Sequence, residues 1–478
     1  MPSPRHAFTA RLRALARALP LGHPPSYVVR PPNHEITLYK GSFVLRQGRL
    51  RALLRGRVYF TWAPSPDVKF QGVATRTSPD LTLAGVVLSV PGAARNVRAY
   101  VWGHSIRKGR NFYRGDAAGS VILGSSRPCS ALRYHVINFH NYWGARTRFG
   151  TRIGPLFSAS RLQLGRSPWE IILDQSPDLD ELRKRLERRG GFGVGHTGVI
   201  TPNPRRSISL DAARALGEVL YFFLAFLNGT RCGPVIMQGL DRRQRVLWSE
   251  WGPWHLTSWQ TSPSWLPVHN AADLAESFDA FHRRWYKGVW RDSLRYVIHW
   301  YVEANTGAGA LEGSIILTQT ALELLGWLEL VETRRVLSRK AYDRLAGAAK
   351  VRALLSALSI PALVPDELTG VQRLIGRRGI ADGPGAIAAL RNATIHPDRT
   401  NRAFVSQINR YGRFQALQLA LSYIELSLLA ILGYNGHYLR RGVSGYYNQM
   451  VSLVPWVRST PAAADASSRV APPSTSTS

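Results

Sequence analysis

The N-terminal third of the chain alternates short apolar runs with turn residues. The runs are rich in β-branched and aromatic side chains, and prolines and glycines such as Pro64, Pro91 and Gly109 separate them. This pattern is typical of β-strands joined by tight turns. Strands are therefore predicted at residues 35–45, 52–62, 81–90, 97–102, 120–123, 132–139 and 169–173. Their spacing predicts a β-sandwich or a barrel-like domain over residues 34–174.

The pattern changes between residues 175 and 284, where helical and loop-like segments mix. Acidic residues begin the segment 177–189 and basic residues end it, which is the charge order that a helix dipole favours. A second helix is predicted at 211–227, after Ser209 as a cap and before the stop signal Asn228-Gly229. Five tryptophans follow between Trp248 and Trp265. They indicate either packed turns of a core, which we favour, or a surface on which unpaired bases stack.

From residue 285 onward the periodicity is helical. Helices are predicted at 290–304, 310–330, 338–358, 365–375, 384–395 and 403–432. In the last of them, apolar residues recur every three or four positions, which predicts a bundle helix with one buried face. Its opposite, polar stripe consists of Gln415, Gln418, Ser422 and Glu425.

Together these patterns predict a multidomain α+β protein with three folded parts. A basic N-terminal segment (1–33) precedes the β-rich, sandwich- or barrel-like domain (34–174). A mixed α/β middle module (175–284) and an all-α helical bundle (285–458) follow. Residues 459–478 are rich in Ser, Thr, Ala and Pro and are predicted to be disordered.

The charge of the chain adds a candidate partner. The chain has 62 Lys+Arg and 30 Asp+Glu, a formal net charge of +32, and most of the basic residues are arginine. Such a surplus attracts phosphate backbones, so RNA or DNA is a candidate partner. Residues 1–60 hold eleven basic residues and one acid, Glu35, which favours recruitment of nucleic acid by this end. Arg242, Arg243 and Arg245, just before the tryptophans, are candidate nucleic-acid-binding residues.

Composition also limits the location and the cofactors. The only cysteines are Cys129 and Cys232, which excludes a disulfide framework and a zinc site built from cysteines. The histidines, among them His255 and His299, show no ligand spacing, so neither a metal nor another cofactor is expected. The longer apolar stretches carry glutamates, so no membrane span or membrane partner is predicted. These features predict a cytoplasmic protein.

One short motif carries candidate chemistry, at the end of the predicted helix 384–395. Arg391, Asn392 and His396 lie within six residues, and Asn392 and His396 are four residues apart, so both can face one side of a helix. An imidazole can move protons to and from the oxygens of a phosphodiester, and a guanidinium can hold the charge that develops on phosphorus. The alternative is a helix-end histidine that caps carbonyls beside an exposed arginine.

The C-terminal region, about residues 285–458, resembles the HEPN superfamily and within it the large ApeA-like clade. The resemblance rests on three strings, at residues 311–325, 390–397 and 425–438, and on their order and spacing. It implies a metal-independent endoribonuclease in which a 2′-hydroxyl attacks its own phosphate, usually at a site shared by two protomers. Members often act in antiphage defence. Carried onto this chain, Arg391 would stabilise the phosphorane, Asn392 would position it and His396 would act as acid and base.

The sequence leaves open whether this domain is an enzyme. Many HEPN domains only dimerise or bind a nucleotide or RNA, so the alternative is a non-catalytic interaction protein with a β-rich sensor domain. Binding of nucleic acid by the basic surface alone is a third interpretation. Glu323 lies on a polar stripe with Glu312 and Gln319. We interpret this stripe as a solvated or interhelical face. The functional alternative is that Glu323 orients Arg391. A homodimer is expected from the resemblance, and the substrate RNA and the trigger stay unknown.

Overall fold

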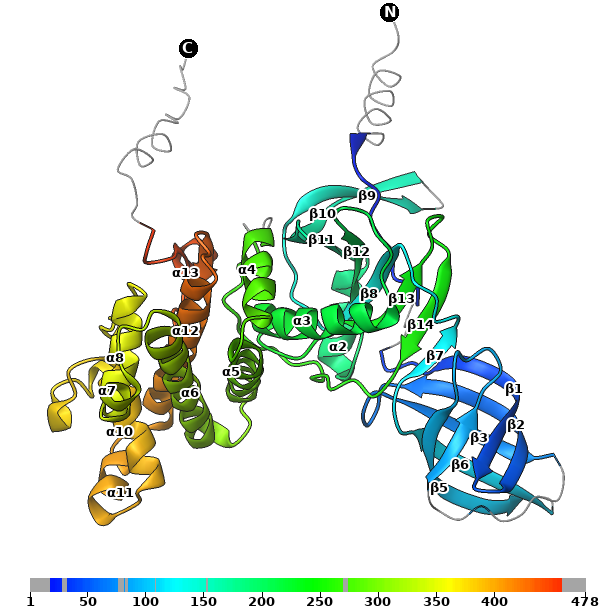
Figure 1. Ribbon diagram of the computed structural model, residues 1–478. Coiled ribbons are helices and arrows are strands. Elements are labelled where there is room, and N and C mark those ends of the chain that lie inside the picture. Colours follow the sequence, from blue (N-terminus) through cyan, green and yellow to red (C-terminus); the bar gives the residue numbers. More distant parts are fainter. Residues whose placement is uncertain are drawn as a thin grey trace, which may run out of the picture.

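The computed structural model describes residues 18–27, 32–75, 81, 85–107, 109–151, 154–269 and 274–457. It has a β-rich N-terminal part and a helical C-terminal part, as expected (Figure 1). Most of the predicted basic segment 1–33 and the whole predicted disordered tail 459–478 lie outside the described residues.

The first β unit is a closed barrel of six antiparallel strands in the order β1-β2-β3-β6-β5-β4. Its strands are β1 (Ile36–Gln47), β2 (Leu50–Thr61), β3 (Asp67–Ala74), β4 (Gly85–Ser89), β5 (Val97–Arg107) and β6 (Arg110–Ala117). Strand β3 shows why the barrel forms, because every second residue, such as Val68 and Phe70, points into the core. At Gly56 and Gly115 a Cβ atom would come within 2.0 and 2.2 Å of a carbonyl oxygen on a neighbouring strand. Glycine therefore permits the close strand contact that the curvature requires.

The second β unit is an eight-stranded sheet in the order β7-β14-β13-β8-β12-β11-β10-β9. Its strands are β7 (Val121–Gly124), β8 (Ala131–Ile137), β9 (Ala145–Thr151), β10 (Gly154–Gly165), β11 (Trp169–Gln175), β12 (Val194–Pro202), β13 (Val235–Leu240) and β14 (Val246–Trp251). The predicted boundary at residue 174/175 is therefore wrong, because β8 pairs with β12 and β13, and β7 with β14, across it. Pairing between strands so far apart in the chain leaves no local sequence signal.

Two helices and the tryptophan-rich segment complete the central part. Helices α2 (Leu179–Arg189) and α3 (Leu210–Asn228) correspond to the predicted helices, and the Ser209 side chain caps α3 by accepting a hydrogen bond from the Ala212 amide. Trp248, Trp251 and Trp265 are at most 1% exposed, which confirms our interpretation of them as core residues. Helix α4 (Ala275–Trp285) follows and packs against β10.

The helical part contains α5 (Trp290–Asn305), α6 (Ala310–Gly326), the π-helix η1 (Trp327–Thr333), α7 (Arg339–Asp343), α8 (Gly347–Ala357), α9 (Thr369–Gln372), the short 3₁₀-helix η2 (Arg377–Gly379), α10 (Gly383–Ile395), α11 (Arg399–Ser406), α12 (Arg410–Ile431) and α13 (Tyr447–Met450). A two-stranded sheet of β15 (His437–Leu439) and β16 (Val451–Leu453) lies beside α13 in the chain. Two predicted helices are divided in the structure. Ala346, whose backbone is extended, separates α7 from α8. Asn409 lies between α11 and α12 and caps α12, because its side chain accepts a hydrogen bond from the Gly412 amide.

The prediction that α12 has a polar, exposed stripe is wrong. Gln415, Gln418 and Glu425 are buried, as is most of the helix. Helices α5, α6, α8, α9 and α10 pack around it, and the segment after it supplies Arg441 as an ion-pair partner of Glu425. A polar side chain can be buried at little cost when such partners satisfy it.

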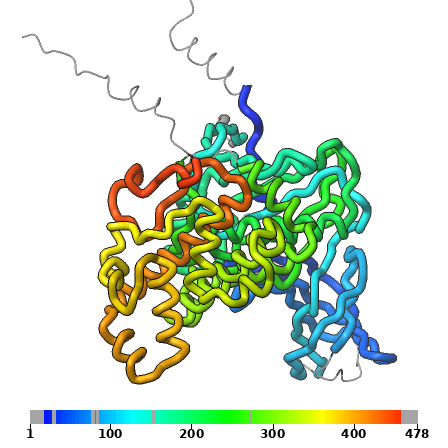
Figure 2. Tube along the Cα trace, turned by 60° about the vertical axis from the view of Figure 1, so that its left-hand side comes forward, coloured from blue at the N-terminus to red at the C-terminus, as the bar shows by residue number. Residues whose placement is uncertain are grey.

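One hydrophobic core runs from the eight-stranded sheet through α3 into the C-terminal helices, and a second core fills the barrel and extends to neighbouring sheet residues such as Val121, Ile137 and Trp251. The stretches Ala310–Thr333 and Arg410–Ile431 are long and apolar enough to cross a membrane, but both are mostly buried here, as core helices are. The barrel and the end of the helical part that carries α11 extend from the central part toward the same side (Figures 1 and 2).

Candidate functional site

Helix α10 positions the predicted motif at an open end of the helical part. Asp382 caps its N-terminus by accepting a hydrogen bond from the Gly385 amide (2.8 Å) and pairs with Arg352 (2.6 Å). Ile387 and Leu390 point into the core. The helix is thereby fixed in rotation, and Arg391 and Asn392 emerge on its outer side, Arg391 half-buried and Asn392 exposed.

The structure brings Arg391 and Asn392 into contact and ties His396 to them through the backbone. The Arg391 Nη1 donates to Asn392 Oδ1 (3.0 Å), and the His396 amide donates to the Asn392 carbonyl (2.9 Å). Asn401 Nδ2 donates to the His396 carbonyl (2.7 Å), so α11 holds the residue from its other side. Among the described residues the exposed His396 imidazole makes no hydrogen bond to a helix carbonyl, so the capping alternative is not what is found.

The surroundings of the motif are basic. Arg399 and Arg402 on α11 are exposed, and Arg378 donates to Asn401 Oδ1 (2.9 Å) and to the Thr400 carbonyl (2.7 Å). No ion pair joins Arg391 to a carboxylate within the described part of the chain. The Arg391 guanidinium therefore keeps its charge available, and one of its nitrogens, Nε, is buried without a hydrogen-bond partner.

Glu323 does not hold Arg391, so the functional alternative, in which it orients Arg391, is wrong. Its carboxylate accepts hydrogen bonds from Gln319 Nε2 (3.0 Å) and Lys350 Nζ (3.5 Å). The Tyr342 hydroxyl donates to its main-chain carbonyl (2.6 Å). Glu323 is an interhelical residue between α6 and α8, in agreement with our interpretation of its stripe as a solvated or interhelical face.

The three candidate arginines of the central part lie in the β13–β14 hairpin. Asp241 accepts hydrogen bonds from the Arg243 and Arg245 amides and pairs with Arg245 Nε (2.7 Å), so Arg245 is engaged within the turn. Arg242 lines a polar cleft of about 620 Å³ together with Arg205 and Arg206. Sequence analysis missed these last two residues, because the segment after β12 and the hairpin line one cleft only in the folded protein.

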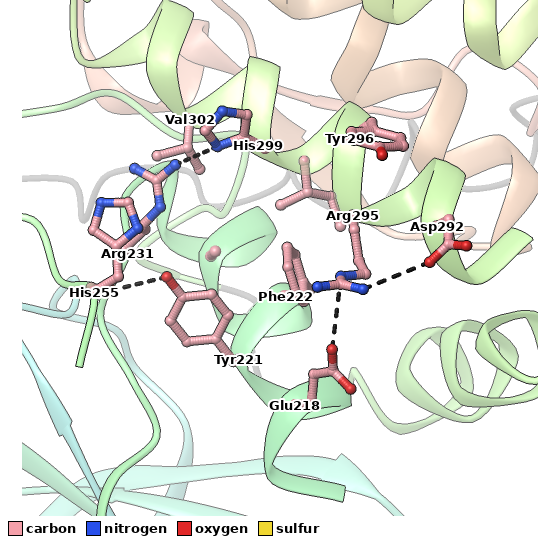
Figure 3. A pocket seen from close by; sticks show the side chains of 12 residues that line it. Glu218, Tyr221, Phe222, Arg231, His255, Asp292, Arg295, Tyr296, His299 and Val302 are labelled. Carbon is pink, nitrogen blue, oxygen red and sulfur yellow. Dashed lines mark hydrogen bonds and ion pairs between the residues drawn. The ribbon is translucent and has the colours of Figure 1, made fainter. Parts of the chain in front are cut away.

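A second cleft, of about 510 Å³, lies between α3 and α5 (Figure 3). Tyr221 and Phe222 from α3 face Tyr296 and Val302 from α5 and make its walls largely apolar. Its polar lining is formed by Arg231, His255 and His299 in one place and by Glu218, Asp292 and Arg295 in another. Apolar walls with a few placed polar groups are typical of small-molecule sites.

Arg231 organises the first of these polar groups. Its Nη2 donates to His299 Nδ1 (2.7 Å) and pairs with Glu303 Oε1 (2.6 Å). Because a guanidinium only donates, His299 accepts at Nδ1 and carries its proton on Nε2. Burial, and then the charge of Arg231, lower the pKa of His255. Sequence analysis found no pattern in these histidines because α5 and two loops bring them together only in the fold.

The described residues contain no group of three or more His, Cys, Asp or Glu side chains that could hold a metal ion.

Comparisons with known proteins give two matches to family descriptions. Residues 124–262 match the family "YopA central domain", and residues 287–451 match the family "YopA C-terminal domain". The chain is 24% identical over 434 residues to the SPbeta prophage-derived uncharacterized protein YopA of Bacillus subtilis (strain 168), covering 89% of this chain and 95% of that protein. No solved structure matches. The central match crosses the predicted boundary at 174/175, in agreement with the sheet.

Proposed function

We propose that the protein is a HEPN-type, metal-independent endoribonuclease. The observation that carries the proposal is the Arg391–Asn392 pair beside an exposed His396 in basic surroundings. These three groups supply what phosphodiester cleavage requires, namely charge stabilisation, orientation and proton transfer. The similarity to a prophage-derived protein supports a role in the conflict between phages and their bacterial hosts, in the cytoplasm.

In the proposed reaction a ribose 2′-hydroxyl attacks the adjacent phosphorus, the P–O bond to the next 5′-oxygen breaks, and a 2′,3′-cyclic phosphate forms. His396 takes the proton of the 2′-hydroxyl or supplies the proton that the 5′-oxygen needs. The Arg391 guanidinium stabilises the negative charge on the phosphorane oxygens. Asn392, whose Oδ1 accepts from Arg391, orients that guanidinium and donates to the substrate through Nδ2.

A second copy of the chain would complete the site. A single imidazole serves as base or as acid, and a second one facing it would take the other role. The open position of the motif at the end of α10 allows two copies to approach with these ends together. We therefore propose a homodimer in which two motifs form one composite site.

The test is cleavage of RNA in EDTA by the wild type, Arg391→Ala and His396→Ala, with products assayed for 2′,3′-cyclic phosphate ends. Loss of either group is expected to lower the rate at least a hundredfold, on the order of what one acid–base or charge-stabilising group contributes. Arg189→Ala, which removes an exposed arginine at the end of α2 in the central part, is the matched control and should retain most activity. Equal cleavage by all four proteins, or none by the wild type, would refute the proposal.

A second candidate function is ligand binding without catalysis, and the α3–α5 cleft favours it. Its aromatic walls suit a nucleotide base, and Arg231 with the two histidines suits a phosphate. A nucleotide bound there would raise the melting temperature of the wild type. Tyr296→Ala should abolish that rise, whereas Tyr411→Ala, an equally exposed tyrosine on α12, should keep it.

A further inference from the structure

The outer surface of the barrel carries a strip of exposed aromatic and basic side chains. On β5, Arg98, Tyr100 and Trp102 alternate with the buried residues Ala99 and Val101. Tyr100 is 59% and Trp102 48% exposed, which is unusual for rings of this size in the middle of a strand. An exposed aromatic pair of this kind points to an interaction site.

Neighbouring strands add cations to the same face. Asp116 on β6 pairs in register with Tyr100 on β5 and with Lys69 on β3, and Arg114 on β6 lies opposite Gly103. The Arg114 guanidinium lies 5.2 Å and the Lys69 ammonium 5.8 Å from the centre of the Trp102 ring. We refer to Arg98, Tyr100, Trp102, Arg114 and Lys69 as the aromatic strip.

Asp116 holds the strip in place. It accepts a hydrogen bond from Trp102 Nε1 (2.9 Å) and lies 3.7 Å from Lys69 Nζ. The indole edge is thus anchored to the sheet while the ring stays accessible. A ring that is already oriented loses little conformational freedom when a flat ligand stacks on it.

The charge around the strip identifies the partner. Residues 34–117 contain 14 Lys and Arg but only four Asp and Glu, a net charge of +10 in a unit of 84 residues. A polyanion is the complementary ligand for such a surface. The exposed rings require in addition that the polyanion present flat apolar faces, which a phosphate chain without bases, or an acidic protein, does not.

We propose that the aromatic strip binds single-stranded RNA. Bases stack on Trp102 and Tyr100, and the phosphates lie against Arg98, Arg114 and Lys69. Sheet faces with exposed aromatic rings and cations hold unpaired bases in this way, whereas paired bases hide their faces inside a duplex. The identification of the strand as RNA rather than DNA rests on the proposed cleavage, which needs a 2′-hydroxyl. The binding itself rests only on the strip.

The strip also gives the barrel a place in the proposed reaction. The barrel and the α11 end extend to the same side of the central part (Figures 1 and 2). One strand of RNA held on the barrel therefore lies on the side of the molecule to which the end that carries the motif also extends.

The experiment measures binding of a fluorescent RNA 12-mer to the full chain carrying His396→Ala, so that no cleavage interferes. Adding Trp102→Ala and Tyr100→Ala is expected to weaken binding at least tenfold, in keeping with the loss of two stacking surfaces. Trp102→Phe keeps a ring and should retain most of the affinity. Trp143→Ala removes another exposed tryptophan, 61% exposed outside the barrel, and should change the affinity less than twofold. An unchanged melting temperature shows that the barrel stays folded.

Three results would overturn the proposal: no binding of the 12-mer, equal binding by the strip variant, or a preference for the RNA duplex. Equal affinity for a DNA 12-mer would overturn the assignment to RNA. Failure of the proposed cleavage is distinguishable, because it leaves binding by the strip intact while the wild type yields no cyclic phosphate.

Discussion

Arg441 is a buried charge that joins four segments of the chain. Its guanidinium donates to Glu425 (2.7 and 2.8 Å), Gln418 (3.1 Å) and the Pro263 carbonyl (2.9 Å), and Tyr301 donates to Glu425 (2.5 Å). Arg441 and Glu425 side chains are each 1% exposed. The cluster therefore connects α12 to α5, to Pro263 in the tryptophan-rich segment and to the segment after α12 that carries Arg441.

Replacing Arg441 by Leu is expected to lower the free energy of unfolding by about 3–5 kcal/mol, because it leaves the Glu425 charge buried without a partner. Urea denaturation measures the loss. The double variant Arg441→Leu, Glu425→Leu should recover much of it. Arg245→Ala breaks a more exposed pair and should change the free energy of unfolding far less. A double variant as unstable as the single one would contradict this account.

Three enclosed histidines predict how stability depends on pH. Burial lowers the pKa of His135 and His140 to about 4 and that of His196 to about 3. The unfolded chain binds protons at these histidines near pH 6.5. Between pH 6.5 and about 4 the unfolded state therefore binds more protons than the folded state. Stability should be complete above pH 6.5 and fall with decreasing pH by up to about 1.4 kcal/mol per unit for each histidine.

Urea denaturation at pH 7, 6 and 5 tests this dependence. In His196→Phe, whose new ring would pack against Phe139 and Tyr142, the slope should be shallower by about a third. An identical slope in the variant would mean that other groups carry the effect.

At the scale of elements, the α10–α11 junction controls the geometry of the motif. Asp398 caps α11 by accepting from the Asn401 amide (2.8 Å), and Asn401 in turn holds the His396 carbonyl. His396 thus depends on a helix that follows it. The sequence signal for this break, an Asp after Pro397, was present, but the predicted helix began later, at residue 403.

Asp398→Ala should lower the free energy of unfolding by only about 1 kcal/mol, as the loss of one cap does, yet reduce RNA cleavage several-fold by releasing His396. Asn409→Ala removes the corresponding cap of α12 and provides the control. It should cost similar stability and spare cleavage. Parallel assays of melting temperature and cleavage rate distinguish the two variants. Equal losses of cleavage in Asp398→Ala and Asn409→Ala would contradict the proposal that Asp398 positions His396.

At the scale of the whole molecule, three parts have separate tasks in the proposed function. The barrel holds the strand and the helical part supplies the cleavage motif. The eight-stranded sheet connects them, because it shares one core with α3 and the C-terminal helices and a second core with the barrel. The α3–α5 cleft lies in that connection. The composite site adds a second copy of the chain.

Mixing the inactive variants Arg391→Ala and His396→Ala should restore part of the cleavage. Heterodimers formed by subunit exchange retain one arginine and one histidine, from different protomers. The single imidazole can take only one of the two proton-transfer roles, so only part of the rate is expected to return. Cleavage is measured before and after incubation of the mixture, with each variant alone as the control. A dimeric mixture that stays inactive would contradict a shared site.

The sequence by itself determined the local elements and the chemistry of single residues. Ser209 and Asn228-Gly229 delimit α3, and Arg391, Asn392 and His396 were identified as candidates, because caps, periodicity and short motifs depend on neighbours in the chain. The basic character of the barrel was equally readable from composition.

Only the tertiary structure decided which residues meet. The pairing of β7 with β14, the burial of Glu425 against Arg441 and the pairing of Glu323 with Lys350 join residues far apart in the chain. The same is true of the convergence of Arg231 and His299, and of the cations that frame Trp102. Such contacts follow from the packing of whole elements, and no local pattern of hydrophobic and polar residues encodes them.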